Sequence, residues 1–246
     1  MSRLGILSGC DRDRTLSPAN HQYYAERHGY CYINDAAPTT HGGFRYKLDK
    51  ISKFLNHGIF DVLFWIDDDA FFMQHDKPLT AFLDQCDGSD LICCKSPMNR
   101  DLQGREIWTY LTSGSFFVRN TPLAREFFDA CRTMPIERME EWWDESRHGL
   151  NTHGDQSIMV YLLHEDPRFN GPDFHRILPF EAFNSRTFHF TERADQHFLL
   201  HFCGGAGSKE QQIAGFAARF GLNTAFIPDD ALAKMRGLRK PALAPS

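Results

Sequence analysis

The hydrophobic positions along the first third of the chain fall into two patterns, short apolar runs and helical stripes. Residues 4–7, 30–33 and 62–66 are mainly apolar runs of strand length. Between them, residues 17–28 and 44–57 have the spacing of helices, and a glycine follows each. The order strand, helix, strand, helix, strand predicts an α/β protein with a parallel sheet and helices on its faces.

The same patterns continue to the C-terminus with longer polar interruptions. Further strands are predicted at 90–94, 113–118, 177–178 and 198–202, and further helices at 78–85, 122–131, 155–163, 208–220 and 229–238. We interpret the polar residues 95–110 as a loop. We interpret the charged residues 135–150, which contain Trp142 and Trp143, as a surface excursion with an aromatic patch.

Length and composition favour one well-packed domain. The chain has 246 residues, and 42% of them, including 22 Phe, are hydrophobic, which is enough for a sizeable core. We predict a domain over residues 1–221 and a C-terminal tail over residues 222–246. The net charge of −5 provides no global basic field, so we expect no nucleic-acid partner.

The cysteines and the longest apolar runs bear on location. Seven cysteines, an odd number, are scattered without a CxxC pair, which argues against a zinc knuckle and is typical of reduced core residues in a cytosolic protein. No run approaches the roughly 18 apolar residues of a membrane span. The apolar core of the N-terminus is too short for a signal peptide. We therefore expect a cytoplasmic protein with no transmembrane segment.

Three consecutive acids follow the apolar run 62–66, and apolar residues return directly after them. Three carboxylates cannot all stay charged in an apolar site without a compensating cation. Asp67 and Asp69 are two residues apart, so in an extended chain they point the same way and predict a divalent-metal site. Asp68 points the other way and is predicted to contact a ligand or support the site. Solvated acids that cap a strand are the alternative.

A histidine near the C-terminal end of a late strand offers a third metal ligand. His201 precedes a glycine cluster that begins at Gly204, and glycines let backbone N–H groups approach a phosphate closely. A mixed shell of carboxylates and imidazole favours Mn²⁺ over Mg²⁺. A histidine that is simply buried in the core is the alternative.

The start of the predicted helix 155–163 presents an acid and an amide. Asp155 and Gln156 are candidates for contact with a substrate at a rigid helix terminus. A capping box formed by Thr152 and Asp155 is an equally good interpretation of the same residues.

Other candidates for ligand contact lie at two strand ends and on one helix. Ser113 and Gly114, at the start of a strand, suit hydrogen bonds to a sugar or phosphate, or alternatively a tight packing point. Lys47 lies beside the apolar stripe of helix 44–57, where a half-buried stem can carry its amine to a phosphate, or where it is an ordinary solvated lysine. Ser8, at the end of the first strand, completes this group.

Several segments occur in the order typical of one family. They are Tyr23–Tyr30, Lys47, Phe64–Phe71, Ser113–Asn120, Asp155–Ser157 and His201–Gly204. On these segments, which span roughly residues 1 to 210, the chain resembles glycosyltransferase family 34, which contains yeast galactosyl- and mannosyltransferases and plant xyloglucan xylosyltransferases. The resemblance depends on the ordered combination and on no single motif.

The resemblance implies a GT-A fold, a Rossmann-like nucleotide-sugar domain with a mixed, mostly parallel sheet. It also implies a retaining, Mn²⁺-dependent glycosyltransferase that moves a sugar, with galactose or xylose favoured, from a UDP-sugar to a glycan or other hydroxyl acceptor. Asp67, Asp69 and His201 would hold the metal, and Asp155 and Gln156 would lie beside the anomeric carbon.

The chain departs from the family pattern at two places. Thr112 and Ser113 replace an Asn-Thr pair, so contacts to the donor sugar are expected to differ. A lysine that the family carries shortly after its His-Phe motif is absent in the same register, and Lys209 is the nearest candidate.

Two mechanisms and two other functions stay open at the level of sequence. Asp155 as nucleophile would give a double displacement, whereas front-side attack would leave Gln156 to stabilise the oxocarbenium-like centre. An inactive nucleotide-sugar-binding protein of the same fold is one alternative function. A metal-dependent phosphohydrolase of the D-x-D-x-T type is the other, although Phe71 stands where that motif requires Thr or Val. Trp108, Trp142 and Trp143 are predicted acceptor contacts, with core packing as the alternative.

Overall fold

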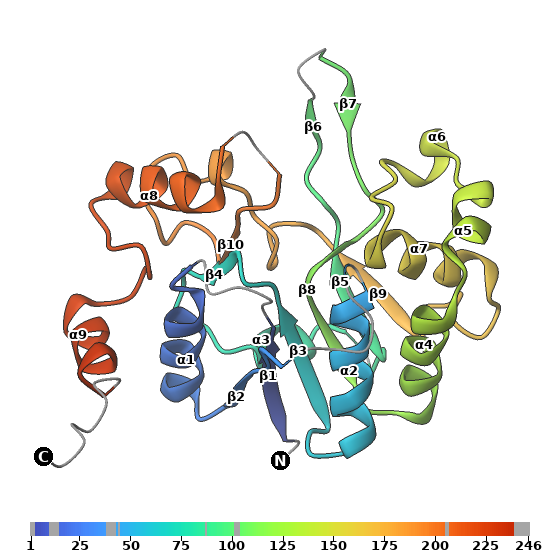
Figure 1. Cartoon of the computed structure of the whole chain (residues 1–246), viewed down its shortest axis with the longest axis horizontal. Helices are drawn as coiled ribbons and strands as arrows, with labels where there is room; N and C mark the ends of the chain where they lie inside the picture. Colours follow the sequence, from blue (N-terminus) through green and yellow to red (C-terminus); the bar gives the residue numbers. More distant parts are fainter. Residues whose placement is uncertain are drawn as a thin grey trace, which may run out of the picture.

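A computed structural model describes residues 3–9, 15–37, 43, 45–86, 88–100, 104–204 and 207–238 of the chain. A six-stranded sheet in the order β2-β1-β3-β8-β5-β9 forms its centre (Figure 1). These strands are β1 (Leu4–Ser8), β2 (Cys31–Asn34), β3 (Val62–Ile66), β5 (Leu91–Cys94), β8 (Thr112–Arg119) and β9 (His175–Leu178). The expected α/β class with a mostly parallel sheet is confirmed.

One strand runs against the others. β8 pairs antiparallel with both β3 and β5, whereas the β1–β2, β1–β3 and β5–β9 pairs are parallel. The carboxyl ends of β1, β3, β5 and β9 therefore lie at one edge of the sheet, where β8 begins. That edge is where open α/β sheets bind their ligands.

Strand β3 is buried because both faces of the sheet are covered. Leu63 and Trp65 contribute to one hydrophobic core, and Val62, Phe64 and Ile66 contribute to the other. Alternate side chains of a strand point to opposite faces, so an uninterrupted apolar run is the pattern that this position requires.

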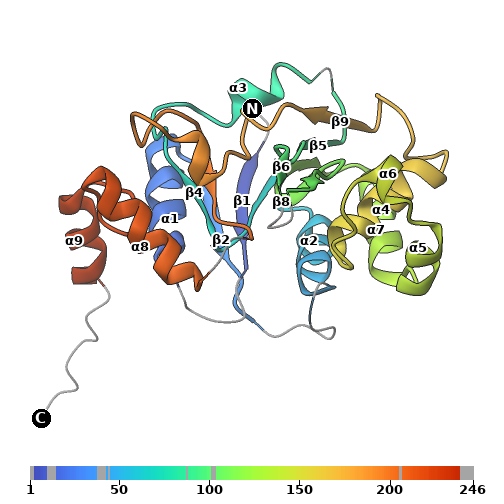
Figure 2. The same cartoon turned by 90° about the horizontal axis from the view of Figure 1, so that it is seen from above.

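Helices cover the two faces, as Figure 2 shows from above. The helices of the structure are α1 (Ser17–His28), α2 (Arg45–His57), α3 (Thr80–Leu83), α4 (Pro122–Thr133), α5 (Ile136–Trp142), α6 (Glu145–His148), α7 (Asp155–Glu165), the 3-10 helix η1 (Thr187–His189), α8 (Lys209–Phe220) and α9 (Asp229–Leu238). Residues of α2, α4 and α7 pack on one face of the sheet, and residues of α1 and α3 pack on the other.

Two small antiparallel pairs complete the fold: β4 (Ala70–Phe72) with β10 (Leu199–His201), and β6 (Asn99–Arg100) with β7 (Glu106–Ile107). The β4–β10 pair lies between the second core and a third one to which α8 contributes. The β6–β7 pair rises above the sheet edge in Figure 1, within the stretch that we predicted to be a loop throughout.

The predicted surface excursion 135–150 is mostly exposed, but its aromatic patch packs partly inward. It contains α5 and α6, and Trp142 and Trp143 are half-buried against the core that α7 shares. Trp142 stacks on His148 with ring centroids 4.0 Å apart, and the indole N–H of Trp143 donates to the carbonyl of Gly149 at 2.9 Å. The charge of this segment concealed the apolar contacts of its two tryptophans.

Residues 222–238, within the predicted tail, pack against the rest of the chain. Ala225, Ile227 and Leu232 are buried and contact α1 side chains that include Tyr23. Figures 1 and 2 both place α8 and α9 at the end of the molecule opposite α4–α7. Among the described residues, no helix combines the length and the apolar composition that crossing a membrane requires.

Candidate active site

The three acids after β3 form a tight turn. The amide of Asp67 donates to the carbonyl of Gly114 in β8 at 2.8 Å, and the amide of Ala70 donates back to the carbonyl of Asp67 at 3.1 Å. The extended backbone that we assumed is therefore wrong. The turn nevertheless brings Asp67 and Asp69 together, because their ligand atoms lie within 4.8 Å of each other and of one in His201.

His201 reaches the acids through strand pairing. It lies opposite Ala70 in the β4–β10 ladder, which places its Nε2 3.2 Å from Oδ1 of Asp69. Its Nδ1 lies 3.0 Å from Oδ1 of the buried Asn184. Because the Asn184 oxygen can only accept, the hydrogen-bond network assigns a proton to Nδ1 and directs Nε2 toward the acids.

The side chains present fit a divalent cation. Two carboxylates and an imidazole are the donor set that Mn²⁺ accepts, and their atoms are close enough to share one ion. Asn184 orients the imidazole in the way that outer partners of metal-binding histidines usually do.

Gly114 provides the space that His201 occupies. A Cβ added at this glycine would lie 2.1 Å from Cε1 of His201 and 2.8 Å from both ring nitrogens. Atoms at such distances overlap, so position 114 accepts only glycine while the imidazole stays in place. We predicted that Gly114 contacts a ligand. In the structure it lies directly against the imidazole of His201, a candidate metal ligand.

Lys47 lies inside the site, and only 13% of its side chain is exposed. Its Nζ is 2.9 Å from Oδ1 of Asp67 and 3.0 Å from Oδ2 of Asp155, and it donates to the carbonyl of Ser113 at 2.8 Å. Burial by itself would lower the pKa of this amine, but the carboxylates of Asp155 and Asp67 outweigh burial and raise it.

Lys209 is the second cation at the acids. It is the first residue of α8, and its Nζ lies 2.9 Å from Oδ2 of Asp69 and also contacts the carbonyl of Phe202. Ser208 and Gln211 form a capping box that fixes this helix start. The structure therefore brings to the site the one lysine whose register the sequence left open.

The two acids differ in their tendency to ionise. Burial raises the pKa of Asp67, despite the nearby Lys47. Burial also acts to raise the pKa of Asp69, but the contacts with His201 and Lys209 outweigh it and lower that pKa. A buried acid pair of this kind is stabilised by added positive charge.

The start of α7 carries Asp155 and Gln156 toward Lys47 and β8. The side-chain oxygen of Gln156 accepts from the amide of Ser113 at 3.1 Å. Oδ2 of Asp155 is buried and forms an ion pair with Nζ of Lys47 at 3.0 Å. The capping-box interpretation is wrong, because the cap of α7 is Gly154 and the amide of Thr152 bonds Ser157 instead.

The remaining predicted residues lie around this centre. Ser8 is buried at the carboxyl end of β1 and accepts from the amide of Asp35 through its carbonyl. The carbonyl of Asp68 accepts from the hydroxyls of Thr15 and Ser17 at 2.8 and 2.6 Å. Gly204, just after β10, is exposed with φ of +70°. Gly205 and Ala206, the next two residues of the cluster, lie outside the described residues.

The sequence analysis did not identify two residues of the site. The indole N–H of Trp65 donates to Oδ1 of Asp67 at 2.7 Å, a contact that the i, i+2 spacing along a strand hinted at. Asn184 lies in an irregular segment and no pattern indicated it. Of the three tryptophans predicted to contact an acceptor, Trp108 lines a pocket.

Comparisons with known proteins agree with this geometry. The model of the galactosyl transferase GMA12/MNN10 family matches residues 15–212. No curated protein matches the chain. A crystal structure described as a glycosyltransferase involved in glycosylation of the major capsid of PBCV-1 superposes with a TM-score of 0.61 at 15% identity, covering 87% of this chain and 98% of the other. A197 from STIV gives a TM-score of 0.41 at 12% identity, over 72% and 82% of the two chains, which is too low to support an argument.

Proposed function

Since this chain belongs to the galactosyl transferase GMA12/MNN10 family and is a glycosyltransferase with a GT-A fold, we propose that it transfers a sugar from a UDP-sugar to a hydroxyl acceptor with retention of configuration and with Mn²⁺ as cofactor. Galactose or xylose is the favoured donor sugar, and a glycan is the favoured acceptor. A cytoplasmic location, suggested by the scattered cysteines, belongs to the same proposal.

The observation that carries this proposal is the position of Asp67, Asp69 and His201 between two lysines. Lys47 contacts one acid and Lys209 contacts the other. Cations at the carboxyl edge of a doubly covered sheet suit a diphosphate, and the three ligand groups suit the ion that a diphosphate brings with it. When bound, Mn²⁺ would be held by these three side chains and would supply Lewis-acid stabilisation of the departing diphosphate.

The chain's own residues have separate tasks in the reaction. Lys47 and Lys209 would balance the negative charge that develops on the leaving group. Electrostatic stabilisation of this kind is the largest single contribution to rate enhancement in many enzymes. The amide of Gln156 is held by the Ser113 backbone and is therefore fixed in direction. Asp155, whose Oδ2 is held 3.0 Å from Nζ of Lys47, is a candidate either as a nucleophile or to orient donor hydroxyls.

Donor binding and turnover test the proposal. Metal-dependent UDP release from a panel of UDP-sugars is expected for the wild type. Asp69→Asn is expected to abolish Mn²⁺-dependent UDP binding in calorimetry, because one carboxylate cannot replace two. Asp173→Asn, an exposed acid elsewhere, is the matched control. Unchanged Mn²⁺-dependent UDP affinity in Asp69→Asn would remove the metal assignment.

A second pair of variants separates chemistry from binding. Gln156→Ala is expected to spare UDP affinity and to lower turnover roughly 100-fold, the scale reported for a single stabilising group. Gln156→Glu keeps an oxygen that can accept from Ser113 and serves to distinguish positioning from charge. Equal loss of binding and turnover would make Gln156 structural. UDP binding without release would indicate an inactive binding protein, and phosphate release from simple monoesters would indicate a phosphohydrolase.

A further inference from the structure

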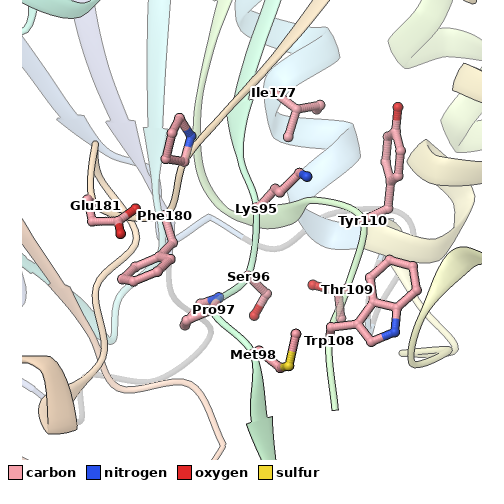
Figure 3. Close-up of a pocket in the computed structure, with 11 residues that line it drawn as sticks. Lys95, Ser96, Pro97, Met98, Trp108, Thr109, Tyr110, Ile177, Phe180 and Glu181 are labelled. Carbon is pink, nitrogen blue, oxygen red and sulfur yellow. The ribbon is translucent and has the colours of Figure 1, made fainter. Parts of the chain in front are cut away.

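A pocket of about 550 Å³ opens beside the candidate active site (Figure 3). Its volume is within the range of small-molecule sites. Lys95 follows β5 and Phe180 comes shortly after β9, so the pocket lies outside the carboxyl ends of these two strands. The acids after β3 lie at the same edge of the sheet, because β3, β5 and β9 point the same way.

The pocket is close to the acids and shares a residue with them. Only β8 separates β5 from β3, so the two strands are about 10 Å apart. The amide nitrogen of Asn184 donates to the carbonyl of Lys95 at 3.1 Å, and its oxygen lies 3.0 Å from Nδ1 of His201. One buried side chain therefore fixes both the wall of the pocket and the candidate metal ligand.

Aromatic side chains form two sides of the pocket. Figure 3 shows Trp108 and Tyr110 on one side and Phe180 on the other, with Met98 between them. Met98 is 62% exposed, an unusual position for a large apolar side chain. A ligand with an apolar face that inserts between these side chains would bury their exposed apolar surface.

The aromatic sides are held in place by packing. Tyr110 meets His164 of α7 edge-on at 4.6 Å between ring centroids, and Phe180 stacks on His189 at 4.3 Å. At Trp108 the backbone is fixed, because its carbonyl accepts from the amide of Leu150 at 2.8 Å. Side chains fixed before binding lose little conformational entropy when a ligand arrives.

The polar lining excludes a second nucleotide site. Lys95 is the single cation among the lining residues, and Glu181 brings a negative charge to the same pocket. Phosphate groups require more concentrated positive charge than this. The combination of aromatic faces with a few polar groups suits a neutral molecule that carries both hydroxyls and an apolar face.

We propose that this pocket binds the acceptor as a glycoside, with an apolar face between Trp108 and Phe180 and the accepting hydroxyl directed toward Asp67, Asp69 and His201. The apolar face is either the C–H face of a sugar ring or an aryl group attached to it. This inference rests on the proposed function. In the transfer, the acceptor oxygen bonds to the anomeric carbon, the bond from that carbon to the diphosphate breaks, and the hydroxyl proton leaves with the diphosphate.

Binding measured without donor or metal tests the pocket independently of catalysis. The probes are methyl and 4-nitrophenyl glycosides of galactose, glucose, mannose and xylose. Saturation-transfer NMR measures their binding to the full chain. Saturable binding by at least one sugar is expected. A strong preference for the nitrophenyl over the methyl glycoside assigns the apolar face to the aryl group, and equal binding assigns it to the sugar ring.

Variants locate the binding. Trp108→Ala and Phe180→Ala are expected to weaken glycoside binding at least tenfold while Mn²⁺-dependent UDP binding persists. Met98→Glu tests the pocket at an exposed position, where a substitution does not disturb folding. Ile59→Glu is its matched control, because Ile59 is 43% exposed and lies at the opposite edge of the sheet. No saturable binding by any glycoside, or wild-type affinity in Met98→Glu and Phe180→Ala, would overturn the proposal. Failure of UDP binding alone would affect only the proposed function.

Discussion

At the scale of single residues, the candidate site depends on contacts between side chains that are distant in sequence. His201 is fixed by Asn184 on one side and by the absence of a side chain at Gly114 on the other. The acids are likewise fixed, because Asp67 accepts from the indole of Trp65 and contacts Lys47. Each group has a defined position before any ligand arrives, which is what precise metal binding and catalysis require.

Gly114→Ala tests this arrangement. The new Cβ would overlap the imidazole of His201, so the ring must move, and we expect Mn²⁺ affinity to fall at least tenfold, together with a loss of about 1–3 kcal/mol in the free energy of unfolding. Titration of free Mn²⁺ by electron paramagnetic resonance and urea unfolding provide the two measurements.

Gly215→Ala is the matched control for this glycine substitution. Gly215 lies on α8, where no atom approaches the position of an added Cβ. We expect this variant to bind Mn²⁺ normally and to gain roughly 0.5–1 kcal/mol, because alanine favours a helix more than glycine does. If Gly114→Ala behaved in the same way, the close approach to His201 would have no consequence.

At the scale of elements, β4 connects the site to the second face of the sheet. β4 begins directly after the acids and pairs with the strand that carries His201. On its other side, His21 of α1 is fully buried and its Nε2–H donates to the carbonyl of Ala70 at 2.8 Å. Nδ1 of the same ring accepts from the hydroxyl of Tyr32 at 3.4 Å. A neutral imidazole therefore connects α1 to β4.

Protonation of His21 is expected to destabilise the protein in acid. Burial lowers the pKa of this imidazole from 6.5 to about 4, against the opposing effect of the Ala70 hydrogen bond. The folded state binds a proton less readily than the unfolded state does. The stability from the neutral ring is therefore complete above about pH 6.5 and is lost as pH falls toward about 4, by at most ~3 kcal/mol.

The comparison of two histidine variants isolates this effect. His21→Gln retains a donor for Ala70 but does not titrate, so its free energy of unfolding should vary less with pH between 6.5 and 4 than that of the wild type. The exposed His57→Gln should follow the wild-type curve. Parallel curves for all three proteins would show that His21 does not contribute to the acid sensitivity.

At the scale of the whole molecule, the C-terminal residues contribute to the core. The amide of Asn20 donates to the carbonyl of Ala225 at 3.0 Å, and His75 contacts the carbonyl of Phe226 at 2.9 Å. Phe226 itself packs with Phe71, Phe202 and α8. The domain boundary at residue 221 stays a prediction, and these contacts bear directly on it.

Phe226→Ala tests how much this segment contributes. Its ring is 4% exposed, and we expect its removal to cost about 3–5 kcal/mol and to lower the melting temperature by about 10 °C. Leu222→Ala, at a position that is 40% exposed, should change the melting temperature little. Calorimetry measures both variants. Equal melting temperatures would mean that the ring of Phe226 does not contribute to stability.

Local features of this protein could be predicted from its amino-acid sequence alone. The apolar run of β3 identified a strand buried on both faces, because alternate side chains must then all be apolar. The residues Asp67, Asp69 and His201 were identified by their chemistry, and the structure brings them together. The expected α/β class and GT-A fold are confirmed as well. They were predictable because the class follows from the order of elements and the fold from an ordered set of motifs.

Which distant side chains meet depends on how the chain folds in three dimensions. The antiparallel direction of β8, the turn that holds the acids, the contact of Asn184 with His201, and the position of Lys209 all depend on pairing between remote segments. The periodicity of apolar residues indicates which face of a helix or strand is buried, but it does not indicate which other element covers that face. The partial burial of Trp142 and Trp143, which we predicted to form a surface patch, has the same cause.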